Sequence, residues 1–422
     1  MIEGTTLMLR EHLLARFLRV RSRTERLAAP LSPEDQNLQS MPAASPTKWH
    51  RAHTTWFFEE FLLAPLGVAR VDARYAYLFN SYYNAVGPRH ARPARGMLSR
   101  PSAAEVSAYR REVDGRVEAL LSSTSDHTLL DLAPIIELGL AHEEQHQELI
   151  LTDIHHALSQ SPLRPEYIPP LDEATRAAPA GEPWIEHPGG LVEVGHAGDG
   201  FAFDNEGPRH RVWLDPFALS RELVRVRDVI AFARADGYRT PSLWLSEGFD
   251  WARANDVTAP LYAEIDGDAM RAFTLHGLRE LDADAPATNL SYYEADAIAR
   301  FLGHRLPTEF EWEAAAGDDA AGGHQLDVDH DGITSSLATE RAGASFYGSA
   351  WVWTASSYEA YPGFWPAEGA VGEYNGKFMV NQRVLRGGSM YTPRGHLRRS
   401  YRNFWHPDTR FQRTGLRLAR RL

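Results

Sequence analysis

The chain has 422 residues, of which 43% are hydrophobic and 24% charged; these are ordinary values for a globular protein, and the length suggests two or three domains. Its net charge of −12 argues against a nucleic-acid-binding protein, because phosphate binding needs surplus lysine and arginine on one face. The absence of cysteine excludes disulfides, thiolate nucleophiles and cysteine metal ligands, so a metal site would have to use His, Asp and Glu. The N-terminal segment carries Arg and Glu within its apolar run, which predicts neither a signal peptide nor a membrane span and indicates a cytoplasmic protein.

The first third of the chain predicts four helices. Apolar residues recur there at helical spacing, and turn-forming residues separate the periodic segments. For the second helix, Ser45 is the expected N-cap and Pro46 the expected first residue. The four helices are expected at residues 7–29, 45–63, 102–123 and 127–158. Four long helices without a strand pattern predict an all-α bundle.

The pattern changes after the fourth helix. Residues 166–183 are rich in Pro and Ala and break both periodicities, as a linker does. From residue 184 onward, short runs such as GLVEVG and HRVWLDPFALS alternate with helical segments at 225–235 and 291–303. The sequence therefore predicts an α+β protein with a helical domain at 1–165 and a mixed, loop-rich domain at 184–422.

The fourth predicted helix contains the motif H-E-E-Q-H, residues 142–146. Residues four apart lie on one helix face, so His142 and His146 can bind a single metal ion. The motif matches the H-E-x-x-H signature of zinc metalloproteases, which need the glutamate as a base and a third ligand downstream. Glu166 lies at a suitable distance, but the surrounding SPLRPEYIPP contains four prolines, which prevent the helix that normally carries this ligand. A metalloprotease is therefore the less favoured alternative.

The second predicted helix offers a different third ligand. Its segment WHRAHTTWFFEEF contains His50 and His53, and bundle proteins build metal sites from side chains on facing helices. Three imidazoles from two helices leave coordination positions open for substrate and oxygen, and they suit Fe(II), Zn(II) or Cu(II). The alternative is that these histidines, and His155 and His156 beside them, are only solvated or packing residues. The residues alone leave both the ligand set and the metal open.

Two groups of motifs resemble known families. SPTKWHRAHTTWFFEEF and HEEQHQELILTD resemble the metal-binding bundle of the DinB-like superfamily. In the second half, FDNEGPRHRV, NLSYYEADAIARFLGHRLPTEFEWEAAA, WVWTASSY, RVLRGGS and RNFWHPDTRFQRTGLRLA look like the formylglycine-generating-enzyme (sulfatase-modifying factor) fold, a C-type-lectin-like architecture. This order of domains resembles that of the iron(II)-dependent sulfoxide synthases of ergothioneine biosynthesis.

The resemblance implies an iron site and a reaction. His53, His142 and His146 would hold Fe(II), His50 would not be a ligand, and Gln145 would touch the histidine-derived substrate. The family joins hercynine (Nα-trimethylhistidine) to a cysteine-type thiol by forming a carbon–sulfur bond, with O₂ as co-substrate and a sulfoxide as product. The C-terminal domain would act as a substrate-binding lid.

Substrate-binding residues are implied in two segments. In RNFW, Asn403, Phe404 and Trp405 would bind the substrate, since an aromatic wall suits a trimethylammonium cation; the alternative is that the two aromatics are core residues. In LFNSYYNAVGPRHARPARGML, residues 78–98, Tyr82 or Tyr83 would donate the proton in the reaction with O₂. Arg92 and Arg95 would clamp the carboxylate of the thiol substrate. Tyr374 and Tyr391 remain alternative proton donors.

Several alternatives stay open. Formylglycine-generating enzymes depend on cysteines in this region, and a chain without cysteine cannot have that activity. Cysteine is the expected thiol donor and γ-glutamylcysteine its alternative, while an unmethylated histidine substrate or a selenium donor would use the same scaffold. Outside this enzyme class, the chain could be a non-catalytic metal-binding module or a thiol transferase of the DinB type. No membrane or nucleic-acid partner is expected.

Overall fold

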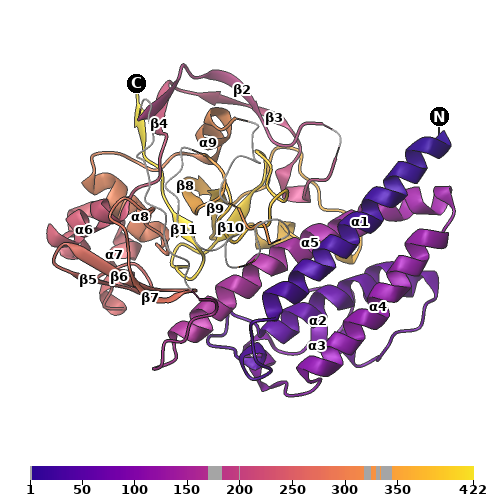
Figure 1. The fold of residues 1–422 in the computed structure, drawn as a ribbon. Helices are drawn as coiled ribbons and strands as arrows, with labels where there is room; N and C mark the ends of the chain where they lie inside the picture. Colours follow the sequence, from indigo (N-terminus) through magenta and orange to yellow (C-terminus); the bar gives the residue numbers. More distant parts are fainter. Residues whose placement is uncertain (1, 170–182, 199, 318–324, 329–332, 334–344) are drawn as a thin grey trace. The chain divides into compact units, whose positions relative to one another are not determined.

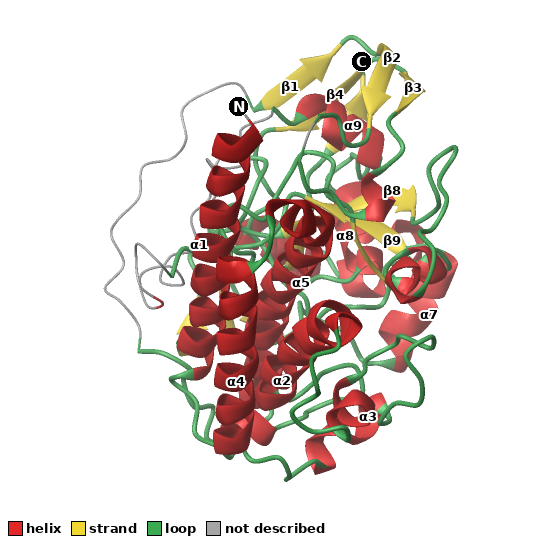
Figure 2. Ribbon diagram, turned by 90° about the vertical axis from the view of Figure 1, so that its right-hand side faces the viewer, coloured by secondary structure: helices red, strands yellow, loops and turns green. Residues whose placement is uncertain are grey.

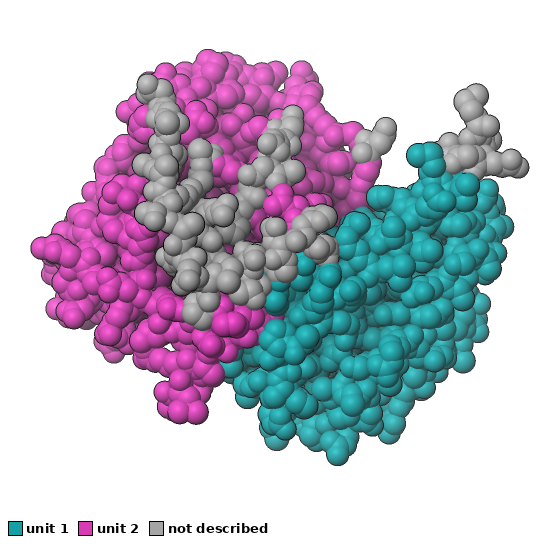
Figure 3. Space-filling view, in the orientation of Figure 1, with its two compact units in different colours: residues 1–160, 328–333, 367–374 teal, residues 161–327, 334–366, 375–422 magenta. Residues whose placement is uncertain are grey.

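The computed structural model describes residues 2–169, 183–198, 200–317, 325–328, 333 and 345–422 (Figure 1). The chain forms two compact units, coloured separately in Figure 3. Unit 1 comprises residues 1–160, 328–333 and 367–374, and unit 2 comprises residues 161–327, 334–366 and 375–422. The chain therefore returns from unit 2 to unit 1 twice. Most of the predicted linker, 170–182, lies outside the described residues, and the predicted domain boundaries at 165 and 184 stay a prediction.

Unit 1 is a helical bundle, as the periodicity predicted. Its four long helices are α1 (Ile2–Ala28), α2 (Thr47–Phe58), α4 (Ala103–Ser123) and α5 (Asp126–Ser159). They lie side by side in Figures 1 and 2; α1 packs on α5 and α4, and α2 packs between α4 and α5. Fully buried side chains of α1, α4 and α5 form the core, among them Phe17, Val113, Val117, Ile136 and Leu140. Burial of these apolar stripes is what holds a bundle together.

The start of α4 follows the local capping rules, whereas the start of α2 does not. The hydroxyl of Ser102 accepts a hydrogen bond from Glu105 N and forms a capping box at the start of α4. The prediction that Ser45 caps α2 was wrong, because α2 begins at Thr47 with Pro46 as its N-cap residue and no side-chain cap. Ser45 instead makes two buried tertiary contacts: its amide donates to Asp153 and its hydroxyl accepts from Arg95.

The connection from α2 to α4 is made of short irregular turns. A π-helical turn (Glu59–Leu63) and a 3₁₀ turn (Ala64–Leu66) continue α2, and the short helix α3 (Tyr75–Phe79) and a second 3₁₀ turn (Arg92–Met97) follow. Gly67 ends the 3₁₀ turn Ala64–Leu66 at φ 80°, a conformation that favours glycine. The loops around α3 carry the predicted tyrosine pair and arginines.

Unit 2 is built from small sheets and short helices. The sheets have the strand orders β1-β4-β12, β10-β9-β8-β11, β2-β3 and β5-β6-β7, and all pairs are antiparallel except the parallel pair β8–β11. The strands are β1 (Trp184–His187), β2 (Gly190–Val194), β3 (His210–Leu214), β4 (Phe217–Ser220), β5 (Ala263–Asp266), β6 (Ala269–Thr274), β7 (Gly277–Glu280), β8 (Trp351–Ser357), β9 (Arg383–Arg386), β10 (Asn403–Trp405), β11 (Thr414–Gly415) and β12 (Ala419–Arg421). The helices are α6 (Val226–Arg234), α7 (Ser246–Ala254), α8 (Tyr292–Phe301) and α9 (Glu309–Ala315). Together the two units confirm the predicted α+β class.

A buried ion cluster explains why charged residues recur in the motifs of the second half. Arg386 is fully buried and donates to Glu309 at 3.0 Å and to Glu313 at 2.8 Å. Arg402 donates to both carboxylate oxygens of Glu309. A buried charge is tolerated only when it is paired and hydrogen-bonded, so these arginines and glutamates fix how β9, β10 and α9 meet. Within the described part of the chain, no helix has both the length and the apolar character needed to cross a membrane.

Candidate metal centre

Three histidines of unit 1 converge. His53 on α2 and His142 and His146 on α5 each bring one ring nitrogen into a group whose atoms lie within 4.8 Å of one another. The Nε2 atoms of His53 and His142 are 3.2 Å apart. Two neutral imidazole nitrogens approach that closely only when a proton or a cation lies between their lone pairs. The spacing and the donor set fit a single metal ion bound by three imidazoles.

The three rings are held in the neutral form that binds metal. Burial lowers the pKa of His53 well below its ordinary value, and the neighbouring His142 and Arg95 lower it further. Burial lowers the pKa of His142 to about 3, and burial together with the other histidines lowers that of His146. Since an imidazolium cannot bind a cation, neutral rings at pH 7 leave the site ready for metal.

The surroundings of His53 orient its ring. Its Nδ1 atom lies 2.6 Å from the carbonyl oxygen of Phe79. Because a carbonyl can only accept, Nδ1 carries the hydrogen and the Nε2 lone pair faces the centre. The indoles of Trp49 and Trp56 stack on the His53 ring at centroid distances of 4.5 and 5.4 Å. His142, by contrast, has a buried Nδ1 atom with no hydrogen-bond partner among the described residues.

The geometry excludes the arrangement of a zinc metalloprotease. Glu143, which would be the base, is 0% exposed and accepts hydrogen bonds from Arg21 at 2.6 Å, Thr24 at 2.6 Å and Arg110 at 2.9 Å. Burial alone would raise its pKa, but Arg21 and Arg110 hold that pKa at about 2. Glu166 is exposed, belongs to unit 2 and is not part of the histidine cluster.

A segment from the far end of the sequence reaches the histidines within unit 1. The hydroxyl of Tyr374 donates to Gln145 Oε1 at 2.5 Å, and its ring lies 5.9 Å from that of His142. The neighbouring Glu373 accepts hydrogen bonds from the backbone amides of Asn84 and Ala85 at 3.1 and 2.8 Å. These contacts fasten residues 367–374 to the loop that follows α3.

The predicted tyrosine pair lies in the same cluster. The rings of Tyr82 and Tyr83 stack at 4.5 Å with their hydroxyl oxygens 3.4 Å apart, and Tyr82 meets Tyr374 edge to face at 6.3 Å. Asn80 fixes the turn, because its side chain accepts from the amide and donates to the carbonyl of Tyr83. Burial, aided by Tyr82 and Tyr374, raises the pKa of Tyr83 well above 10, so its phenol keeps its proton at neutral pH.

The predicted arginines differ in their surroundings. Arg95 is 2% exposed, lies 3.4 Å over the Trp49 ring and donates to Ser45 Oγ and Ser81 Oγ. No carboxylate pairs with it among the described residues, and burial, aided by the charge of Arg92, lowers its pKa to about 8. Arg92 is exposed and donates to the carbonyl of Ala43. A buried guanidinium without a carboxylate partner favours an anionic ligand.

The remaining predicted residues belong to unit 2. Asn403, Phe404 and Trp405 form β10 and are half-buried; Phe404 stacks on Tyr358 at 4.0 Å and Trp405 meets Phe411 edge to face. Their role as substrate-binding residues stays a prediction. Tyr391, the other alternative proton donor, is also in unit 2 and is buried.

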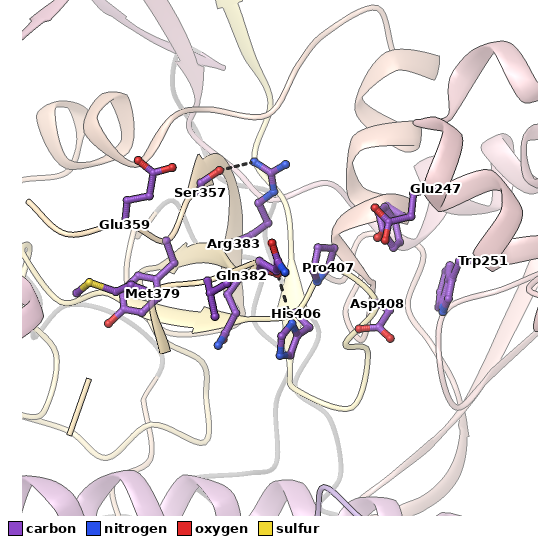
Figure 4. A pocket seen from close by; sticks show the side chains of 14 residues that line it. Glu247, Trp251, Ser357, Glu359, Met379, Gln382, Arg383, His406, Pro407 and Asp408 are labelled. Carbon is purple, nitrogen blue, oxygen red and sulfur yellow. Dashed lines mark hydrogen bonds between the residues drawn. The ribbon is translucent and has the colours of Figure 1, made fainter. Parts of the chain in front are cut away.

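Unit 2 also contains a hollow that the sequence did not predict (Figure 4). Its volume is about 920 Å³, and its lining includes Glu247 and Trp251 of α7, Arg383 of β9, and His406 and Asp408 after β10. None of the three predicted residues of β10 lines it. Several of its residues, among them Tyr293, Tyr358, Arg383 and His406, lie in the motifs noted in the sequence, but these motifs are far apart along the chain, and only the fold brings them together.

The sequence reasoning missed one further pair, His50 and Asp153. The two nitrogens of His50 lie 2.7 Å from His146 Nδ1 and 3.0 Å from Asp153 Oδ2. A signal was available, because Asp153 follows His146 by two helical turns on α5 and therefore lies on the same face.

Comparison with known families matches both halves of the chain. The profile of the DinB superfamily matches residues 16–150, and that of the sulfatase-modifying factor enzyme 1-like domain matches residues 172–332 and 342–422. A solved structure of PvdO from Pseudomonas aeruginosa is 20% identical with a TM-score of 0.37, covering 57% of this chain and 94% of its own.

Relatives match over the full length as well. The hercynine oxygenase of Mycobacterium tuberculosis is 30% identical over 97% of this chain and 98% of its own, and that of Mycolicibacterium smegmatis is 29% identical over 97% and 99%. A formylglycine-generating enzyme of Thermomonospora curvata is 33% identical over only 31% of this chain. With relatives of this name aligned over nearly its whole length, at up to 30% identity, the chain belongs to the hercynine oxygenase family of oxidoreductases.

Proposed function

We propose that this protein is an iron(II)- and O₂-dependent sulfoxide synthase that joins hercynine to the sulfur of cysteine. The observation that carries the proposal is the cluster of three neutral imidazoles, two buried (His53 and His142) and one half-buried (His146), with Gln145 and three phenols beside it. Full-length relatives named hercynine oxygenase support hercynine as the substrate.

The residues present fit a bound iron. His53 and His142 face each other through Nε2 atoms 3.2 Å apart, and three neutral nitrogen donors leave coordination positions open. Bound Fe(II) would supply the reduction of O₂ and the positions at which the reactants meet. Three imidazoles would also accept Zn(II) or Cu(II), so the choice of iron comes from the family and from the oxidative reaction.

Substrate orientation is assigned to three groups. Gln145, whose carboxamide is fixed by the Tyr374 hydroxyl, binds the imidazole of hercynine. Asn403 and the rings of Phe404 and Trp405 receive its trimethylammonium group, since an aromatic face attracts a cation. Arg95, with Arg92, binds the carboxylate of the thiol substrate, because the buried guanidinium of Arg95 has no carboxylate partner among the described residues.

Proton transfer is assigned to the tyrosine pair. The raised pKa of Tyr83 keeps a proton on its buried phenol, and Tyr82 lies within 3.4 Å of that hydroxyl. A phenol that donates this proton directs the reaction toward sulfoxide and away from simple oxidation of the thiol. Tyr374, bonded to Gln145, is the second candidate for the same role.

The test is an anaerobic reconstitution with Fe(II), followed by exposure to O₂ with hercynine and cysteine and mass spectrometry of the products. We expect a product that contains both substrates and one oxygen atom, and no product when iron, O₂ or either substrate is omitted. His142→Gln should abolish it, because the variant removes one of three metal ligands. His127→Gln, at an exposed position on the same helix, is the matched control and should leave the yield unchanged.

The same experiment separates the alternatives. Coupling with γ-glutamylcysteine but not with cysteine would identify γ-glutamylcysteine as the thiol donor. Coupling with histidine, or with a selenium donor, would identify that compound as the substrate instead. A protein that binds iron but couples no combination would be a metal-binding module, and the proposed reaction would be wrong.

A further inference from the structure

A buried hydrogen-bonded chain lies behind His146 in unit 1. The Nδ1 atom of His146 is 2.7 Å from Nδ1 of His50, and His50 Nε2 is 3.0 Å from Asp153 Oδ2. The same carboxylate oxygen accepts the backbone amide of Ser45 at 2.8 Å. His50 is 2% exposed and Asp153 is 6% exposed, so solvent does not compete for these bonds.

The carboxylate of Asp153, at one end of this hydrogen-bonded series, determines which ring nitrogen of His50 and of His146 carries the hydrogen. An ionised carboxylate only accepts, so His50 carries a hydrogen on Nε2 and presents the Nδ1 lone pair of a neutral ring to its partner. His146 must then donate from its own Nδ1. With its hydrogen on Nδ1, His146 keeps the Nε2 lone pair free for a cation, which is the tautomer a metal ligand needs.

The three histidines therefore differ in the hydrogen-bond partners of their rings. His53 donates to a neutral carbonyl, that of Phe79, and His142 Nδ1 has no partner among the described residues. Of the three, and counting only the described residues, His146 alone is connected by hydrogen bonds to a carboxylate. A carboxylate that backs a ligating imidazole fixes its orientation and raises its basicity.

We propose that His50 and Asp153 are positioning residues of the metal centre, which set the tautomer and ring plane of His146 and strengthen it as a donor. The arrangement differs from a direct carboxylate–histidine contact in that a second imidazole stands between the charge and the ligand. This inference rests on the proposed metal site but not on the identity of the substrates. A merely structural role is the competing explanation, because Asp153 also holds Ser45 just before α2 begins.

The test measures metal affinity rather than turnover. Co(II) and Zn(II) binding is followed by chelator competition and by the visible spectrum of the Co(II) protein, for the full chain and for Asp153→Asn, His50→Gln and the double variant. Removal of a hydrogen-bond partner of a metal ligand costs about 10- to 100-fold in metal affinity. We expect a loss of that size in each single variant, a changed Co(II) spectrum, and no further loss in the double variant, because either substitution breaks the same chain.

Matched controls come from α5 itself. Asp131 lies 3.5 Å from His127 in an exposed pair on the same helix, so Asp131→Asn and His127→Gln make the same chemical changes away from the site. Both should bind Co(II) like the unmodified protein.

Three results would overturn the proposal. They are an unchanged Co(II) affinity in Asp153→Asn, fully additive losses in the double variant, and a drop in apo-protein stability without any change in affinity or spectrum. The last result would establish the structural role. The metal-binding test uses no substrate. A protein that shows the expected affinities but makes no sulfoxide would therefore support this inference and contradict the proposed reaction.

Discussion

At the scale of single residues, the hydroxyl of Tyr83 is the group whose loss has the clearest consequence. Tyr83→Phe keeps the ring that packs on Trp56 and Phe61 but removes the proton. We expect the ratio of sulfoxide to oxidised thiol to fall by about 10²- to 10⁴-fold, the usual contribution of a positioned acid, while O₂ consumption continues. Product ratios from mass spectrometry together with an oxygen electrode measure both quantities.

The neighbouring phenols provide the comparison. Tyr82→Phe should share the defect, since the two hydroxyls are 3.4 Å apart. If instead Tyr374→Phe alone diverts the products, the proton comes from the segment that returns to unit 1, and the assignment to the tyrosine pair is wrong.

In unit 2, Glu206 makes stability depend on pH. It is 0% exposed and accepts hydrogen bonds from Arg398 and from Ser400 Oγ at 2.6 Å. Burial alone would raise its pKa, but the charge of Arg398 and these hydrogen bonds lower that pKa below 4.5. Because the folded-state pKa is the lower one, the stabilisation is complete at pH values above 4.5 and is lost as the pH falls through and below that value.

The Glu206→Gln variant tests this dependence. At pH 7 it should be less stable by on the order of 2 kcal/mol, because the amide leaves Arg398 without its counter-charge. The difference from the unmodified protein should shrink as the pH falls below 4.5. Urea unfolding followed between acid and neutral pH measures it, with the exposed Glu193→Gln as control. A difference that is constant with pH would contradict the prediction.

At the scale of secondary-structure elements, Gly139 controls how closely α5 approaches α2. A Cβ atom there would lie 2.8 Å from Phe58 Cε1 and 3.1 Å from Phe57 Cδ1, and the Phe57 ring contacts His142 at 4.8 Å. Gly139→Ala should therefore lower the free energy of unfolding by about 1–3 kcal/mol, as overpacking does, and also weaken metal binding. Chemical denaturation and Co(II) titration measure the two effects.

Gly115 is the matched control within the same bundle. It is exposed on α4, and a Cβ atom there would meet nothing within 4 Å. Gly115→Ala should raise stability by about 0.5–1 kcal/mol through helix propensity and leave metal affinity unchanged. Equal effects of the two substitutions would show that contact with the phenylalanines is unimportant.

The elements also show what a sequence can and cannot predict. Periodicity and turn residues located α4 and α5 to within a residue, and the caps that the structure shows there, Ser102 and Ser125, are equally local interactions. Two of the three clustered histidines were evident for the same reason, since four-residue spacing fixes a helix face. The prediction of a Ser45 cap was wrong because the amide and hydroxyl of Ser45 form hydrogen bonds with Asp153 and Arg95, which are distant in sequence.

Contacts between distant segments were the harder part of the site. Tyr374 was only an alternative, and its neighbour Glu373 was not predicted, because nothing near either residue marks a contact with Gln145 or with Asn84. Only the family resemblance identified His53, and not His50, as the third metal ligand. The structure provides a physical reason, since both nitrogens of His50 already face His146 and Asp153.

At the scale of the whole molecule, the division into two units predicts a local response to metal. A ligand that binds only the folded state at one hundred times its dissociation constant adds about 2.7 kcal/mol of stability. The histidines lie on α2 and α5, so hydrogen exchange should slow most in those helices of unit 1. Peptides from β8 and β9 in unit 2 should change least.

Hydrogen exchange with mass spectrometry makes this comparison in the presence of Zn(II), which binds imidazole without redox chemistry. His142→Gln provides the control in which no peptide should respond. Equal protection of both units by metal would contradict the prediction, because it would show that they unfold as one cooperative body.

The return of residues 367–374 to unit 1 has a consequence for the synthesis of the protein on the ribosome. The nascent chain contains all three histidines once residue 160 has been made, but Glu373 and Tyr374 follow only after roughly 200 further residues. At about 5–20 residues per second, this interval lasts roughly 10–40 s. During it, an emerging bundle that captures metal would hold it without the tyrosine that later bonds to Gln145, so loading with metal can precede completion of the site.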